Sequence, residues 1–274
     1  MLQTPPPPGM GWIVHPRETS PKEGNSSAIS RAGLRASAIL AGLLITASVR
    51  VVQAENPYLV IPPAHEAEAT FAYRTANLSD EQAIAELARR QIPYRKEAVP
   101  VAGVRSPIRL AGPLHGVFIH SSLPEAERAT TPYEILDARL AIALDELCKI
   151  LALHDITEVI HFTLYRPPGT TLEDPSLAQN RHPGGMAIDL GAMKKRDGEW
   201  LSVGHHWAAA IGSKTCGVDA RKLEPRRGRE LISIVCELAD QRIFHYMLSP
   251  HFDRHHHDHL HLEIRAGARS FLVN

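Results

Sequence analysis

A histidine-rich run near the C-terminus constrains this chain more than any other segment. Residues 249–265 read SPHFDRHHHDHLHLEIR, and eleven consecutive positions within them hold six of the sixteen histidines. The end of the run alternates polar and apolar residues, as a half-buried strand does, so His259 and His261 should project from the same face. Two imidazoles on one face can share a metal ion. The alternative is a solvated histidine tract.

The overall charge argues against one class of partner. Lysine plus arginine equals aspartate plus glutamate at 30 each, so the chain lacks the basic field of a nucleic-acid-binding protein. With 274 residues, of which 44% are hydrophobic, it is long enough for one sizeable core with appendages. We therefore expect no nucleic-acid partner.

Residues 1–54 are typical of a leader with a signal peptide. Arg31 and Arg35 precede an apolar stretch at 36–49, and Val-Gln-Ala at 52–54 supplies a small-x-small cleavage site. The apolar stretch is shorter than the roughly 20 residues that span a bilayer, so cleavage is favoured over anchoring. These features predict an exported protein of the periplasm or cell envelope. Its one expected membrane contact is this segment, if it stays uncleaved.

The remaining chain is predicted to form a linker and one compact domain. Residues 55–95 should be a linker with a short helix at about 79–91, in which Ser79 and Gln82 form a capping box and Pro93 ends the helix. The compact domain is expected over residues 96–274, with strands at about 99–110 and 117–119.

Two helices and three further strands are predicted inside this domain. The longest helix should begin at Thr131, with Pro132 at its first position and Glu134 completing a capping box. A leucine stripe at three- and four-residue steps should then be buried as far as Leu153. A second helix is expected at 226–239, and strands at 156–165, 186–193 and 243–248.

A second motif lies about seventy residues before the histidine run. The sequence NRHPGGMAIDLG at 180–191 places His182 before a Pro-Gly-Gly turn and Asp189 on the strand that follows. Gly184 and Gly185 allow a sharp backbone path between the two residues. Many isolated pairs of this kind are surface capping groups. This pair becomes evidence for a shared site only together with the later His-x-His motif.

Together the motifs resemble the superfamily of lysostaphin-type, D-alanyl-D-alanine and hedgehog-type zinc proteins. Residues 180–189 follow the family pattern Ser-x-His-x-x-Gly-x-Ala-x-Asp, except that Asn180 replaces the serine, and residues 259–261 match its His-x-His. The resemblance covers about residues 100–274. The bacterial extensin-like branch fits best, through segments at 165–168, 181–185, 215–217, 234–236 and 271–273. It implies an α+β fold, with a small, mainly antiparallel sheet and flanking helices.

The resemblance also implies a zinc ion (Zn2+) held by His182, Asp189 and His261. Two nitrogens and one carboxylate leave the fourth tetrahedral position open, which is typical of a catalytic zinc site rather than a structural one. Zinc in such a site lowers the pKa of water and polarises a carbonyl group. Hydrolysis then needs little besides a base and a group that stabilises the developing anion.

Four further residues are candidates for the catalytic chemistry. His256 matches the position of the base in murein endopeptidases, and Asp258 matches the glutamate of the D-Ala-D-Ala dipeptidase type. We favour His256, because Asp258 is shorter than the glutamate that it would replace. His259 would flank the zinc and hydrogen-bond the transition state. Arg166 resembles the family arginine that binds the substrate or its tetrahedral oxyanion.

The other polar residues of the histidine run have less specific expectations. His251, His255 and His257 are expected to be solvated in the loop. Asp253 either orients a ligand histidine or is a plain turn residue. Glu263, two residues after His261, faces either the site or the solvent.

The three cysteines allow one disulfide bond. In an exported protein Cys216 and Cys236 could pair, with a stabilisation of about 3 kcal/mol for a loop of that size. Cys148 would remain as a buried thiol on the leucine stripe. The sequence alone does not establish the pairing.

The implied function is zinc-dependent hydrolysis of an amide bond in peptidoglycan peptides, by an endopeptidase or a carboxypeptidase. Two alternatives remain open from the sequence. One is a non-catalytic, zinc-containing module that binds the cell wall. The other is a hydrolase for a different ester or amide of the envelope.

Overall fold

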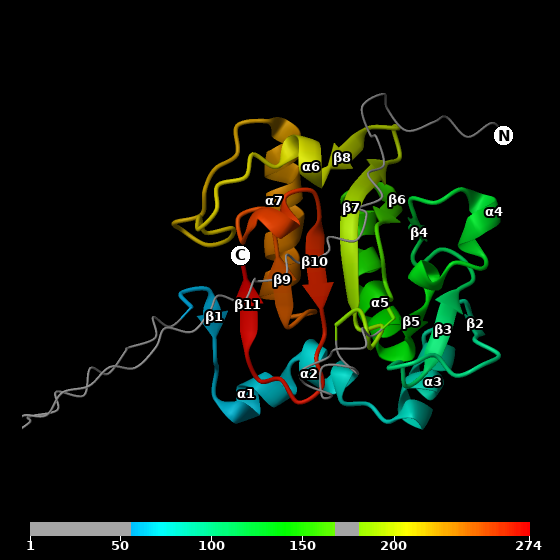
Figure 1. Cartoon of the computed structure of the whole chain (residues 1–274). Helices are drawn as coiled ribbons and strands as arrows, with labels where there is room; N and C mark the ends of the chain where they lie inside the picture. Colours follow the sequence, from blue (N-terminus) through cyan, green and yellow to red (C-terminus); the bar gives the residue numbers. More distant parts are fainter. Residues whose placement is uncertain (1–55, 168–180) are drawn as a thin grey trace, which may run out of the picture. The chain divides into compact units, whose positions relative to one another are not determined.

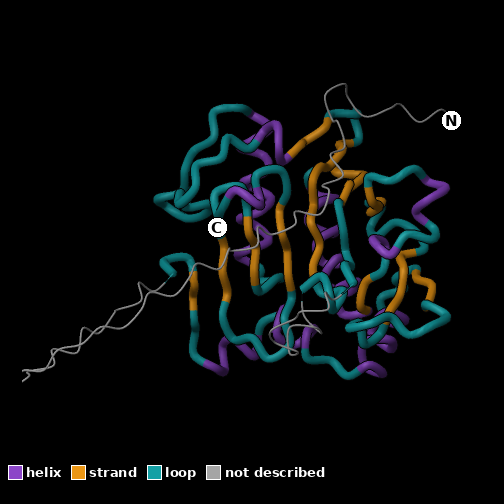
Figure 2. Tube along the Cα trace, in the orientation of Figure 1, coloured by secondary structure: helices purple, strands orange, loops and turns teal. Residues whose placement is uncertain are grey.

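The end of the histidine-rich segment forms a strand of a large mixed β-sheet (Figures 1 and 2). The structure is a computed structural model that describes residues 56–167 and 181–274. The strands of this sheet are Leu59–Val60 (β1), Phe118–Ser121 (β4), Ile156–His161 (β6), Ala187–Lys195 (β7), Trp200–Ser202 (β8), Tyr246–Leu248 (β9), Leu260–Glu263 (β10) and Phe271–Val273 (β11). Their order is β1-β11-β9-β10-β7-β6-β4, and β8 pairs with β7. A second sheet has the order β2-β3-β5, with bounds Tyr94–Lys96, Pro107–Leu110 and Leu136–Asp137.

Two pairings of the large sheet are parallel. Strand β4 runs parallel to β6, and β11 runs parallel to β9, whereas the pairs around β7 and β10 are antiparallel. Helix α5 (Ala138–Leu153) lies between β4 and β6 in the chain, and a crossover of this kind returns the chain for parallel pairing. The α+β class is therefore confirmed. The large sheet is mixed, whereas a mainly antiparallel sheet was expected.

The two long helices cover one face of the large sheet. The described helices are Ala64–Ala69 (α1), Phe71–Ala76 (α2), Asp80–Arg89 (α3), Glu125–Arg128 (α4), Ala138–Leu153 (α5), Val203–His206 (α6) and Arg226–Asp240 (α7). In Figure 1 the two long helices, α5 and α7, lie behind the strands. Leu260 and Leu262 of β10 belong to the hydrophobic core on this side. Because side chains alternate along a strand, His261 and Glu263 project to the other face.

The longest helix begins later than predicted. Thr131 caps a short 3-10 helix, Pro132–Glu134 (η1), and the chain then forms β5 before α5 starts. Asp137 is the N-cap of α5, because its carboxylate accepts a hydrogen bond from the backbone N–H group of Arg139 at 3.0 Å. The same carboxylate also accepts a hydrogen bond from the backbone N–H group of Ser106 at 2.9 Å. The expected helix at 226–239 is confirmed as α7.

Residues 56–95 differ from the expected linker. They form β1, α1, α2, α3 and β2, and the contacts of the chain group Glu55–Asn274 into one compact unit. Ala67, Ala72, Ala83 and Leu87 of these helices are fully buried in the main core. Only the short helix was foreseen, and its capping box at Ser79 is present.

Three predicted strands are shorter than expected. Strand β3 covers only the end of the 99–110 segment, β6 ends at His161 rather than near residue 165, and β9 begins at Tyr246. In the described part of the chain, no helix is long and apolar enough to cross a membrane. The expected leader at 1–54, as well as Asn180, lies outside the described residues.

Candidate metal centre

The pairing of β7 with β10 places Asp189 directly opposite His261. Residues in such a pair share one face, and their Cβ atoms lie about 4.5–5.5 Å apart. His182 reaches the same point from the turn that leads into β7. One ligand atom from each of the three side chains lies within 4.8 Å of the others, and all three residues are buried. The structure therefore brings together the three expected metal ligands.

The inner atoms of this cluster contact one another, and the outer ring nitrogens have separate partners. His182 Nε2 is 3.0 Å from Asp189 Oδ1 and 3.2 Å from His261 Nδ1, and His261 Nδ1 is 3.0 Å from Asp189 Oδ1. On the outer side, His182 Nδ1 lies 3.2 Å from the Leu164 carbonyl oxygen. His261 Nε2 lies 3.2 Å from Glu263 Oε2. Metal-binding histidines are typically held in this way by a carbonyl or carboxylate group.

Gly185 allows the turn after His182 to pack closely against the start of α5. Its φ is 65°, and a Cβ at this position would come within 2.8 Å of the Asp137 backbone nitrogen. The Gly185 carbonyl oxygen instead accepts a hydrogen bond from that N–H at 2.9 Å. Glycine is therefore required here for both its left-handed conformation and its lack of a side chain.

Burial and mutual contacts determine the charges of the cluster. Burial lowers the pKa of His182 and so favours the neutral imidazole that binds metals. Burial opposes ionisation of Asp189, but the neighbouring His182 and His261 hold its pKa well below the usual range. For His261, burial is outweighed by hydrogen bonds to Asp189 and Glu263, which raise its pKa. The site thus presents an ionised carboxylate beside a neutral His182, whereas His261 would have to lose its proton before it could bind a metal ion.

Arg166 contacts the other oxygen of Asp189. Its guanidinium NH2 group lies 2.6 Å from Asp189 Oδ2, and 58% of its side chain is exposed. Arg166 lies beyond the end of β6, because this strand is shorter than the strand expected at 156–165. Its accessible guanidinium could contact an anionic group while it still holds Asp189.

Asp253 orients His256. The Asp253 carboxylate caps the 3-10 helix Arg254–His256 (η3) and lies 2.7 Å from His256 Nδ1. The imidazole of His256 lies near that of His261, with ring centroids 5.9 Å apart. Burial lowers the pKa of His256, although Asp253 acts in the opposite direction. Asp253 thus caps this turn and also holds His256, which is a candidate base and not one of the three expected ligands.

Asp258 contacts His259 rather than the centre of the cluster. Its Oδ1 atom lies 2.9 Å from His259 Nδ1, while His259 Nε2 points inward and lies 3.5 Å from Asp189 Oδ1. His259 therefore flanks the three ligand residues, as expected from the sequence. Asp258 is separated from them by the His259 ring, which makes His256 the better placed of the two candidate bases.

Two residues of the histidine run differ from or extend the expectations. His251 is fully buried rather than solvated, and its Nδ1 accepts a hydrogen bond from the Ala210 N–H at 3.0 Å. His255 and His257 are exposed, as expected. Glu263 is 2% exposed and faces the site. In the sequence, the only indication that Glu263 could face the site was its position two residues after His261.

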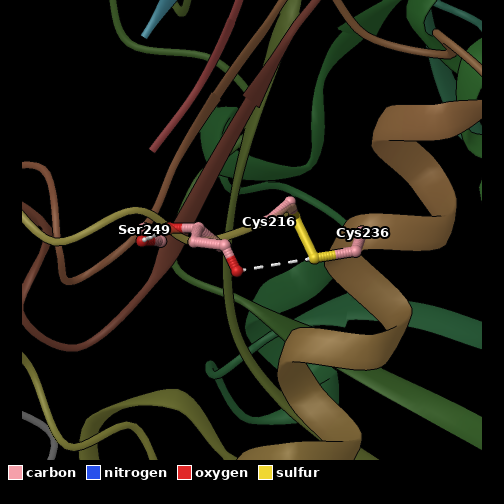
Figure 3. Close-up of a disulfide and its surroundings, with 4 residues drawn as sticks. Cys216, Cys236 and Ser249 are labelled. Carbon is pink, nitrogen blue, oxygen red and sulfur yellow. Dashed lines mark hydrogen bonds between the residues drawn. A yellow bond between two sulfur atoms is a disulfide. The ribbon is translucent and has the colours of Figure 1, made fainter. Parts of the chain in front are cut away.

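A disulfide bond lies beside this segment. Cys216 and Cys236 are bonded and join the loop after α6 to helix α7 (Figure 3). Thr215 Oγ1 in the same loop lies 3.0 Å from Ser249 Oγ at the start of the histidine run. Cys148 is a buried free thiol. The expected pairing is thus present in the structure.

Fold and site together define an α+β protein with a buried His-Asp-His cluster that could hold a metal ion. Residues 144–271 match the family model described as Extensin-like protein C-terminus. This segment contains every candidate ligand and catalytic residue, so the match to the extensin-like model covers the part of the chain that bears the site. No curated protein and no solved structure matches the chain.

Proposed function

We propose that this protein is a zinc-dependent hydrolase that cleaves an amide bond in peptidoglycan peptides, as an endopeptidase or a carboxypeptidase. The observation that carries the proposal is the convergence of His182, Asp189 and His261 within 4.8 Å. The resemblance of the same motifs to D-Ala-D-Ala metallopeptidases supports the reaction class. The match to an extensin-like domain is compatible with it but does not specify the reaction.

The donor set of this cluster fits zinc. It offers two imidazole nitrogens and one carboxylate oxygen, the ligand types of catalytic zinc sites. The Leu164 carbonyl and the Glu263 carboxylate hold the two imidazoles in the required orientation. Bound zinc would supply Lewis-acid chemistry, which polarises a carbonyl and lowers the pKa of water.

His256 would be the general base. Its Nδ1 is held by Asp253, and Nε2 is the ring nitrogen left to take a proton. The lowered pKa of His256 favours its neutral form at neutral pH, which is the form that a base needs. Once His256 is protonated, the Asp253 carboxylate would stabilise the imidazolium, which could then return the proton to the leaving amine.

Arg166 and His259 would stabilise negative charge on the carbonyl oxygen. Both groups lie beside Asp189, one on each of its carboxylate oxygens. Donors that are already in place stabilise charge as it develops and cost little reorganisation in the transition state. This arrangement, with a positioned base, favours an enzyme over a module that only binds the cell wall.

The proposed location is the periplasm or cell envelope, where peptidoglycan or its peptide fragments would be the partner. The signal-peptide pattern at 1–54 is the main support for export. The disulfide between Cys216 and Cys236 is compatible with an oxidising compartment, though it is weaker support.

Digestion of purified peptidoglycan, followed by mass analysis of the released fragments, tests the proposal. Zinc-loaded wild type should release fragments that differ by one cleaved amide bond. His256→Ala should keep its metal and its fold but lose about 10²–10⁴-fold in rate. His255→Ala is the matched control, because its exposed imidazole belongs to the same short helix and should leave the rate unchanged.

A different result would identify the competing class. Peptidoglycan that stays intact with zinc-loaded wild type, together with zinc-dependent binding that survives His256→Ala, would contradict the hydrolase and indicate a wall-binding module. Release of fragments with ester rather than amide cleavage would contradict the proposed bond.

A further inference from the structure

Two imidazoles beside the His-Asp-His cluster are held in the way that metal-binding histidines are held. His256 Nδ1 lies 2.7 Å from Asp253 Oδ1, and His259 Nδ1 lies 2.9 Å from Asp258 Oδ1. A carboxylate on one ring nitrogen fixes the tautomer and the orientation of the ring, and it leaves the other nitrogen with a free lone pair. In both rings the other nitrogen is Nε2. His256 and His259 can therefore each offer one nitrogen to a metal ion.

The two rings lie about as close together as the rings of the two expected ligands. The ring centroids of His256 and His259 are 5.2 Å apart, and those of His182 and His261 are 5.0 Å apart. In the His182–His261 pair this spacing places two ring nitrogens 3.2 Å from each other, close enough to share one ion. The His256–His259 pair thus has the ring spacing of a two-imidazole metal site.

The Nε2 atoms of this pair are open to a ligand. His259 Nε2 lies 3.5 Å from Asp189 Oδ1, so it points toward the cluster. His256 Nε2 has no hydrogen-bond partner among residues 56–167 and 181–274. The side chains of His256 and His259 are 12% and 14% exposed, so an ion can reach them from the solvent.

Aromatic contacts and negative charge also favour a cation at this pair. Phe252 packs against His256 and Phe162 packs against His259, with ring centroids 5.6 and 5.9 Å apart. These contacts restrict the rotation of each imidazole, so less entropy is lost when an ion binds. The two carboxylates that hold the rings carry two negative charges, which offset the charge of a divalent cation.

We propose that His256 and His259 form a second, weaker zinc site beside the cluster of His182, Asp189 and His261. Imidazole nitrogens suit zinc, whereas magnesium and calcium prefer oxygen ligands. The pair offers two side-chain ligands where the cluster offers three, so it should fill only after the cluster has filled. Zinc at the pair would occupy the free nitrogen of the proposed base. Excess zinc should therefore inhibit hydrolysis, a consequence that rests on the proposed function.

Calorimetric titration of the full chain with zinc tests the site without any measurement of activity. The cluster is first loaded with one zinc ion per chain, and further zinc is then added. Wild type should bind a second ion, with a Kd well above that of the first. His256→Ala and His259→Ala should each lose the second ion and keep the first. Asp253→Asn keeps both imidazoles and should weaken the second ion about 10–100-fold.

Controls separate the pair from the rest of the histidine run. His255→Ala and His257→Ala remove exposed imidazoles of the same run, and both variants should bind the second ion like wild type. Magnesium in place of the added zinc should not bind. One zinc ion retained in each variant, by elemental analysis, shows that the cluster is intact. Uptake of only one ion by wild type would overturn the site. So would loss of the second ion in the control variants, or its retention in both His256→Ala and His259→Ala.

Turnover distinguishes a failure of this site from a failure of the proposed reaction. Cleavage of peptidoglycan that falls as the second ion binds, over the same zinc concentrations, would support both. If the one-zinc protein cleaves peptidoglycan but binds no second ion, the second site is wrong and the hydrolase stands. If the second ion binds with the predicted variant pattern but nothing is cleaved at any zinc concentration, the hydrolase is wrong and the site stands.

Discussion

Each imidazole of the cluster has two nitrogens, and the partner of the outer nitrogen fixes what the inner one can bind. The outer nitrogen of His182 faces a backbone carbonyl, whereas that of His261 faces the Glu263 carboxylate. His256 is held in the same manner by Asp253. The family resemblance implied the three candidate ligands, but the sequence could not reveal Leu164 as a partner, because that contact depends on how the chain packs after β6.

Replacement of Glu263 should weaken metal binding without removal of a ligand. In Glu263→Gln the His261 ring loses its anionic partner, so zinc affinity should fall about 10–100-fold, as measured by competition with a chelator. Glu158→Gln is the matched control, since Glu158 pairs with His120 in the same way at 3.0 Å, away from the cluster. Equal zinc affinity in wild type and Glu263→Gln would contradict the assigned role.

His245 should make the fold less stable in mild acid. Burial lowers its pKa from 6.5 to about 4, although a hydrogen bond with Ala268 and the charge of Glu263 act to raise it. Its Nδ1 accepts a hydrogen bond from the Arg265 N–H, so the folded state favours the neutral ring. The unfolded chain takes up the proton near pH 6.5. This stabilisation is therefore complete above pH 6.5 and is lost as the pH falls toward 4, by on the order of 3 kcal/mol.

Urea unfolding at several pH values, with His245→Asn for comparison, measures this contribution. The Asn side chain keeps an acceptor near the position of Nδ1 but does not titrate. Its free energy of unfolding should therefore change less than that of wild type between pH 6.5 and pH 4. Parallel curves for the two proteins would show that His245 is not the responsible group.

At the scale of elements, the sequence predicted those whose signals are local. The capping box of α3 and the apolar stripe of α7 lie within each helix, and both were found. Strand β5 was missed because its cause is distant: the Asp137 carboxylate accepts a hydrogen bond from Ser106, thirty-one residues earlier. The helices of 56–76 were missed because their buried faces are alanines, which give a weak hydrophobic pattern.

The disulfide should stabilise the loop that precedes α7. The double variant Cys216→Ala/Cys236→Ala should lose about 3 kcal/mol of unfolding free energy, and reduction of wild type should have a similar effect. Thiol titration of unreduced, denatured protein should find only Cys148 free. A reductant that lowers the stability of the double variant as much as that of wild type would contradict this account. Three free thiols in the exported protein would also contradict it.

At the scale of the molecule, the candidate site joins segments that are distant in the sequence. His182 and Asp189 precede His261 by more than seventy residues, and the antiparallel β7–β10 pair brings them together. The mixed strand order could not be read from the sequence, because hydrophobic patterns do not specify which strands become neighbours. A metal ion at this point would connect the two strands through side chains as well as backbone.

Removal of the metal should therefore lower the melting temperature. A ligand that binds only the folded state, at a free concentration 100 times its Kd, adds about 2.7 kcal/mol, or on the order of 5–10 °C for a domain of this size. Addition of EDTA to zinc-loaded wild type should remove this increment, and excess zinc should restore it. His261→Ala should show no zinc-dependent change. A melting temperature of zinc-loaded wild type that does not change with EDTA would contradict a metal ion that connects β7 and β10.

Metal content measured by elemental analysis on four purified proteins tests the central claim most directly. Wild type should contain one zinc per chain. His182→Ala and His261→Ala should contain almost none, because each removes a ligand nitrogen, whereas His256→Ala should retain one. Full zinc in both ligand variants, or loss of zinc in His256→Ala alone, would contradict the assignment of His182, Asp189 and His261 as the metal site.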